Sequence, residues 1–150
     1  MYLGIIIATM LVLPLASLAL ELALAGGAPL LLAAKWFVFW GVGVRVGLAA
    51  VRQMAQPDFT ARMLHIVDPR ASIVVRELGF ANGAIALISL LALPFPSFLV
   101  PAAVAGALFL GLAGIQHARV RERGGKETIA MVSDLAMAGL LALLLLARLA

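Results

Sequence analysis

Five apolar segments, each long enough to cross a lipid bilayer as a helix, make up most of this chain. A spanning helix needs about 20 predominantly apolar residues, and the segments that reach this length cover residues 3–25, 30–54, 69–93, 98–117 and 128–149. Of the 150 residues, 65% are hydrophobic and 12% are charged, so no separate soluble domain fits beside the spans. The sequence therefore predicts one all-α domain over residues 1–150, an integral membrane bundle of about five helices.

Glycine and proline mark the boundaries of the first span. Gly26, Gly27 and Pro29 predict a tight turn between the first two spans. Pro14 lies in the middle of the first span and is expected to kink it. No Lys or Arg precedes Lys35, so the basic region that begins a secretory signal peptide is missing. We therefore expect the first segment to be a spanning helix.

A polar connection over residues 55–72 separates the second and third spans. Apolar residues are interspersed with charged ones there, which predicts a short helix at the membrane interface. At the end of this connection, Asp68 followed by Pro69 is typical of a helix start, with aspartate as the N-cap and proline in the first turn. We therefore expect the third span to begin at Pro69.

The distribution of basic residues predicts how the bundle is oriented. The turn at 26–29 and the hairpin at 94–97 carry no charge. The connections at the opposite end carry Arg62, Arg70, Arg119, Arg121, Arg123 and Lys126. Because basic loops stay in the cytoplasm, we expect the N-terminus there and the C-terminus outside, with Arg148 as a counter-signal. The net charge of +4 follows from this distribution, and a nucleic-acid partner is not expected.

Glu21 and Lys35 lie at nearly equal distances in sequence from the glycine turn, one on each of the first two spans. In an antiparallel hairpin, equal distance from the turn means equal depth in the membrane. A charged side chain at the bilayer centre costs about 2.5–3.5 kcal/mol on insertion scales, so such residues need partners. We therefore expect an ion pair with a structural role, the alternative being a substrate or proton site.

A second group of polar and ionisable residues lies toward the predicted cytoplasmic side. Glu77 is about 12 Å into the third span and Asp134 about 9 Å into the fifth, counted at 1.5 Å per residue. The long side chain of Arg45 can reach the same depth. The candidate intramembrane cluster consists of Arg45, Arg76, Glu77, Asn82 and Asp134. Either Arg76 or Arg52 balances the second carboxylate, or one carboxyl group carries a proton.

The sequence contains no catalytic or metal-binding motif. It has no cysteine, which excludes disulfides and thiolate metal sites within the chain, and it lacks nucleotide-binding and hydrolase motifs. Gln116 and His117 end the fourth span and are interpreted as interfacial polar groups, because isolated histidines do not form a haem or metal site. We expect no catalytic residue and no metal. The cofactor is unknown, and a quinone or a lipid is compatible with the sequence.

Two pairs of glycines, Gly43 with Gly47 and Gly79 with Gly83, have the GxxxG spacing that lets membrane helices approach closely. Close packing within the chain explains this spacing as well as association between chains does. Besides the lipid bilayer, the expected partners are therefore other membrane subunits, or further copies in a homo-oligomer formed through the GxxxG faces.

Three stretches of the second and third spans resemble one known family. They are WGVGVRVGLAA at 40–50, RQMAQP at 52–57 and RELGFANG at 76–83. Together they resemble the DoxX-like family of small multi-pass bacterial membrane proteins over roughly residues 35–117, with the first span as an addition before the usual four-helix core. The resemblance implies a helical bundle in a prokaryotic cytoplasmic membrane, with Arg45 and Glu77 facing its interior. It also implies a link to quinone-dependent sulfur oxidation or redox maturation in some relatives.

These observations leave three hypotheses for the function. The first is a non-catalytic accessory or structural subunit of a membrane complex, without enzymatic activity. The second is a small-molecule or proton-linked transporter or binding protein that uses the intramembrane cluster, although the same residues can form a polar lock between helices. The third is a quinone-linked redox component, which depends mainly on the family resemblance.

Overall fold

The computed structural model describes the chain except for residues 1, 64–65, 67, 69, 122–123 and 150. Within this part of the chain there is no strand, and five helices are long and apolar enough to cross a membrane. They run over Tyr2–Leu24, Pro29–Ala55, Ala71–Leu91, Pro96–Arg119 and Gly125–Arg148. The five predicted spans are confirmed, with each end within three residues of the prediction.

Several spans combine more than one type of helix. The first span consists of α1 (Tyr2–Ile7), the π-helix η1 (Ala8–Val12) and α2 (Leu13–Leu24). The second consists of α3 (Pro29–Phe37), the π-helix η2 (Val38–Val44) and α4 (Arg45–Ala55). The other elements are α5 (Pro57–Met63), α6 (Ala71–Leu91), the short 3-10 helix η3 (Pro96–Phe98), α7 (Leu99–Arg119) and α8 (Gly125–Leu149).

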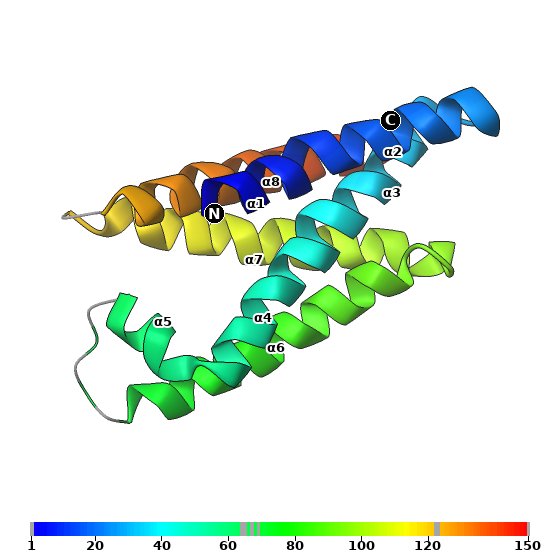
Figure 1. Ribbon diagram of the computed structural model, residues 1–150. Helices are drawn as coiled ribbons and strands as arrows, with labels where there is room; N and C mark the ends of the chain where they lie inside the picture. Colours follow the sequence, from blue (N-terminus) through cyan, green and yellow to red (C-terminus); the bar gives the residue numbers. More distant parts are fainter. Residues whose placement is uncertain (1, 64–65, 67, 69, 122–123, 150) are drawn as a thin grey trace.

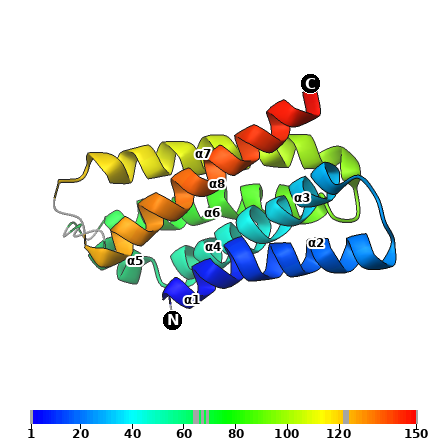
Figure 2. The ribbon, with the colours of Figure 1, turned by 90° about the horizontal axis from the view of Figure 1, so that it is seen from above.

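The second span crosses the bundle diagonally (Figure 1). Its beginning, α3, packs against α2 and α8, whereas its end, α4, packs against α6. The helices α7 and α8 form an antiparallel pair that runs the length of the bundle. Figure 2 shows the N-terminus toward the end that holds α5 and the α7–α8 connection, and the C-terminus toward the opposite end.

The surface of the bundle is more apolar than that of a soluble protein. Large side chains such as Leu24, Leu112 and Leu143 are 66–79% exposed, and contiguous apolar surface of this kind is found where a protein contacts lipid or a partner. The interior holds an apolar core centred on Val42 and Met137, which are almost completely buried. The helices therefore have an apolar face toward the core and another available to lipid.

The turn between the first two spans has the conformation that its glycines predict. Gly26 and Gly27 have φ angles of +69° and +121°, which residues with a side chain rarely adopt. The next helix, α3, begins at Pro29, whose fixed φ and missing N–H suit a first helical position. The turn therefore reverses the chain within a few residues.

The π-helices η1 and η2 contact each other within the first two spans. In η1 the N–H of Leu13 donates to the carbonyl of Ala8, five residues back. Pro14 follows directly, and its ring crowds the carbonyl four residues earlier, so the backbone opens at this point. The irregularity expected at Pro14 therefore takes the form of a π-helical turn. No sequence pattern predicted η2.

The polar connection contains the expected short helix, α5. The predicted start of the third span is wrong by two residues, because α6 begins at Ala71 with Arg70 in the cap position. The carboxylate of Asp68 accepts the backbone N–H of Arg70 at 2.8 Å, which forms a local turn ahead of the helix. Pro69, the predicted first helical residue, lies outside the described residues.

The two GxxxG motifs pack against helices of the same chain. A Cβ added to Gly43 would lie 2.9 Å from Leu90, and one added to Gly79 would lie 2.9 Å from Met54. Leu90 belongs to α6 and Met54 to α4, so each motif faces the helix that carries the other. Both glycine faces thus take part in packing within the chain.

We predict that Gly79→Ala destabilises the protein by about 1–3 kcal/mol, the usual cost of overpacking. The new Cβ would lie 3.1 Å from the backbone nitrogen of Met54, which cannot move aside without shifting α4. Gly139→Ala is the matched control, since an added Cβ there meets nothing within 4 Å. Thermal unfolding in detergent, followed by circular dichroism, measures both. Equal midpoints for the two variants would contradict this packing.

Candidate functional site

The most buried charged group in the bundle is an ion pair between the second and fifth spans. Arg45 is the first residue of α4, and its Nη2 forms an ion pair and hydrogen bond with Oδ1 of Asp134 on α8. The same nitrogen donates to Oγ of Ser133 at 2.8 Å. The side chains of Arg45 and Asp134 are each only 9% exposed. The contact therefore links two residues that are 89 positions apart in sequence and belong to different spans.

Close packing about one helical turn from the pair holds η2 against α7 and α8. Gly41 of η2 lies against Met137 of α8, so closely that an added Cβ would come within 2.3 Å of the methionine Cε. Val42 similarly fits against Gly106 of α7. Because η2 leads directly into Arg45, these contacts set the position from which its side chain reaches α8.

Residues of two further spans take part in the electrostatics of the pair. Asp134 interacts with His117 near the end of α7, and the charges of both Arg45 and Asp134 act on Tyr2 of α1. Ser133 donates its hydroxyl hydrogen to the carbonyl of Ala130 at 2.9 Å, which leaves its oxygen to accept from Arg45. Within the described residues, the Nη1 atom of Arg45 is buried without a hydrogen-bond partner.

Two members of the predicted cluster lie elsewhere. Glu77 and Arg76 are exposed on α6, so the prediction that Glu77 meets Arg45 and Asp134 is wrong. The buried positions of α6 form one stripe: Ala71, Val75, Gly79, Asn82, Ala86 and Ser89. Glu77 follows Val75 by two residues, or about 200° of rotation, and therefore lies on the opposite face. The depth of a residue along a helix does not show which face of the helix carries its side chain, so counting residues could not predict the exposure of Glu77.

Asn82, another member of the predicted cluster, faces the interior of the bundle. It is 3% exposed, and its Nδ2 donates to Oε1 of Gln53 on α4 at 2.8 Å. Its Oδ1 is buried and has no partner among the described residues. This hydrogen bond joins the second and third spans, separately from the Arg45 ion pair.

Glu21 and Lys35 meet across the first hairpin. Lys35 Nζ forms an ion pair with Glu21 Oε1, and Nε1 of Trp36 donates to Glu21 Oε2 at 2.6 Å. One turn farther from the loop, Nε1 of Trp40 donates to Oγ of Ser17 at 3.0 Å. These partners are equally spaced about the turn, so the two tryptophans and Lys35 fix the register of the hairpin.

The residues predicted to be polar groups at the end of the fourth span differ in exposure. Gln116 is exposed, whereas His117 is partly buried and interacts with Asp134. In the part of the chain that the structure describes, no group of three His, Cys, Asp or Glu side chains is arranged to hold a metal ion.

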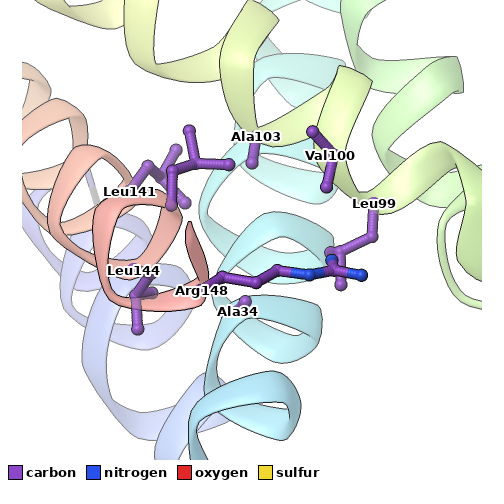
Figure 3. Close-up of a pocket in the computed structure, with 8 residues that line it drawn as sticks. Ala34, Leu99, Val100, Ala103, Leu141, Leu144 and Arg148 are labelled. Carbon is purple, nitrogen blue, oxygen red and sulfur yellow. The ribbon is translucent and has the colours of Figure 1, made fainter. Parts of the chain in front are cut away.

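Two pockets lie away from the ion pair. The first has a volume of about 10 Å³, the space of about one water molecule, and lies between α3, α7 and α8. Figure 3 shows Arg148 of α8 extending across this pocket between Ala34 and Leu99. The second is an open cleft of about 450 Å³ between α4, α5 and α6. Neither pocket includes Arg45 or Asp134 in its lining.

Sequence reasoning missed Ser133, Gln53 and Ser17 as partners. Ser17 lies one helical turn before Glu21 and could have been proposed from the helix face that the two residues share. Ser133 directly precedes Asp134 but lies about 100° away around the helix, so spacing alone did not indicate it. Gln53 lies at the end of a span, where polar residues are common. Its pairing with Asn82 depends on the rotation of α6, which no motif specifies.

In comparisons with known proteins, no family model, no curated protein and no solved structure matches this chain. The resemblance to DoxX-like proteins therefore depends on the three quoted stretches alone. Of the two residues that the resemblance places in the bundle interior, Arg45 is buried and Glu77 is exposed. The site is accordingly defined by the contacts of Arg45.

We predict that Asp134→Asn lowers the free energy of unfolding by about 3–5 kcal/mol, because it leaves Arg45 buried without a counter-charge. Glu77→Gln makes the same chemical change on an exposed side chain of a span and should have an effect within about 0.5 kcal/mol. Reversible unfolding in detergent measures both. Similar losses in the two variants would show that the interior pair has no special role.

Proposed function

We propose that this protein is a non-catalytic accessory or structural subunit of a membrane complex. The observation that carries the proposal is the buried pairing of Arg45 with Asp134 and Ser133. These groups bind each other across two spans and line neither pocket, so their hydrogen-bonding capacity is largely used in holding the helices together. Ionisable groups inside a membrane that are used in this way act as links between helices.

The outward-facing charge on the third span supports a partner. Glu77 is exposed six residues after the start of α6, and no basic group lies within 4 Å of it in the described part of the chain. A carboxylate on the outer face of a span is stabilised when a polar or basic group of another subunit contacts it. A partner helix with such a group beside α6 fits an accessory role.

The proposed location is the cytoplasmic membrane of a prokaryote, with the N-terminus in the cytoplasm and the C-terminus outside. The support is the concentration of basic residues in the connections at one end of the bundle. Arg148, the counter-signal, lies in the last turn of α8. A cation there is stabilised by the negative end of the helix dipole, so its presence has a local explanation.

One observation favours a second candidate, a small-molecule or proton-linked binding protein. Nη1 of Arg45 is a buried donor without a partner among the described residues. A ligand that accepts a hydrogen bond could use this donor. The quinone-linked role has less support, because the pocket beside Arg148 holds only about one water molecule.

Native mass spectrometry of the gently solubilised protein, isolated from its own membrane, tests the proposal. We expect a reproducible protein partner to remain bound. The double variant Arg45→Met/Asp134→Leu, which replaces the ion pair by apolar side chains, should retain the same partner because the pair acts within the chain.

Two outcomes would contradict the accessory role. The first is that the wild-type chain is always recovered without another protein, since an accessory subunit needs a partner. A small molecule that the wild type retains and the double variant loses would support the binding protein instead. Glu77→Gln serves as the matched control for the second outcome, since Glu77 lies away from Arg45.

A further inference from the structure

The open cleft at the end of the bundle is built from three helices. It lies where α4 ends, and its lining comes from Ala55 of α4, from α5 and from the first two turns of α6. Figure 1 shows α5 folded back beside the ends of α4 and α6. Ala61 of α5 is buried with Ala71 and Val75 of α6. This small apolar cluster attaches α5 to α6, so the cleft has a defined shape.

The cleft has an excess of positive charge. Arg62 and Arg76 line it together with one acidic residue, Asp58. Arg52 lies at its edge, with its guanidinium carbon 4.0 Å from the ring centroid of Phe59, which also lines the cleft. In the described part of the chain, none of these three arginines has a carboxylate within 4.0 Å. Their positive charge is therefore not neutralised by a neighbouring carboxylate and is available to an anionic ligand.

The surroundings of the cleft are those of a membrane surface. Arg76 lies five residues after the start of α6, or about 7.5 Å along a span of 21 residues. On the same side of α6, Ile73 and Phe80 are 62% and 55% exposed, three residues before and four residues after Arg76. Basic side chains thus lie beside apolar surface at the level where a span begins. This arrangement is complementary to a phospholipid, whose anionic headgroup lies beside its acyl chains.

We propose that this cleft binds the phosphate group of an anionic membrane lipid, with Arg62 and Arg76 as donors and Arg52 adding positive charge. Guanidinium groups bind phosphate oxygens through charge-assisted hydrogen bonds, often two at a time. Gln56 also lines the cleft and can contact the polar part of the headgroup. The exposed Ile73 and Phe80 favour a lipid over free phosphate, because they provide a surface for acyl chains on the same side of α6 as Arg76.

Lipid binding to the purified full chain in detergent tests this assignment. The probes are phosphatidylglycerol, which is anionic, and phosphatidylcholine with the same acyl chains, and native mass spectrometry counts the bound lipid. We expect the wild type to prefer phosphatidylglycerol. Arg62→Gln/Arg76→Gln should weaken that binding about tenfold or more, since each lost charge-assisted hydrogen bond removes about that factor.

The matched control is Arg119→Gln/Arg121→Gln, which removes the same charge from exposed residues beyond the cleft. It should bind phosphatidylglycerol as the wild type does. Asp58→Asn should strengthen binding, because it removes the negative charge from the cleft. This variant keeps the test decisive if the double arginine variant fails to fold.

Three results would overturn the assignment. One is unchanged lipid binding in the cleft variant, and another is an equal loss in the control variant, which would show an effect of net charge alone. The third is displacement of phosphatidylglycerol by inorganic phosphate at low concentration, which would assign the cleft to free phosphate instead of a lipid.

Discussion

The bundle depends on one buried ion pair, in which Arg45 of the second span contacts Asp134 of the fifth. Inside a membrane protein an unpaired charge costs far more than a pair with good hydrogen-bond geometry. The contact between the two side chains forms only when α4 and α8 have one relative register. The pair therefore fixes the helix that crosses the bundle diagonally (Figure 1). The small residues Gly41 and Gly106 then let α8 and α7 approach η2 on either side.

Composition and hydropathy were sufficient to predict the number and approximate limits of the spans, because length and apolar content are what the bilayer requires. Counting residues from the turns also predicted that Glu21 lies at the depth of Lys35, and Arg45 at the depth of Asp134. Depth in a spanning helix follows from the rise per residue alone. The same counting failed for Glu77, because rotation about the helix axis decides which side chains face inward. The π-helix η2, which packs against η1 and α6, was not predicted, because no residue pattern in this stretch marks it.

Charged residues in this structure fall into two groups with different roles. Those inside the bundle, such as Arg45 and Lys35, have a carboxylate partner on another span. Those at the end with the basic connections, such as Arg62 and Arg76, are exposed and have no carboxylate within 4.0 Å among the described residues. The first group joins helices, and the second supplies the positive charge of the cleft between α4, α5 and α6. The interior ion pairs and the proposed lipid site therefore use different residues of the chain.

The central claim is that Arg45 and Asp134 stabilise the bundle as a pair. A double-mutant cycle with Arg45→Met, Asp134→Leu and the combined variant measures this directly, using unfolding free energies in one detergent. We expect the two single losses together to exceed the loss in the combined variant by about 1–3 kcal/mol, within the range of about 0.5–3 kcal/mol found for residues in contact. Losses that add to within about 0.5 kcal/mol would mean that the two side chains act independently, and would contradict the claim.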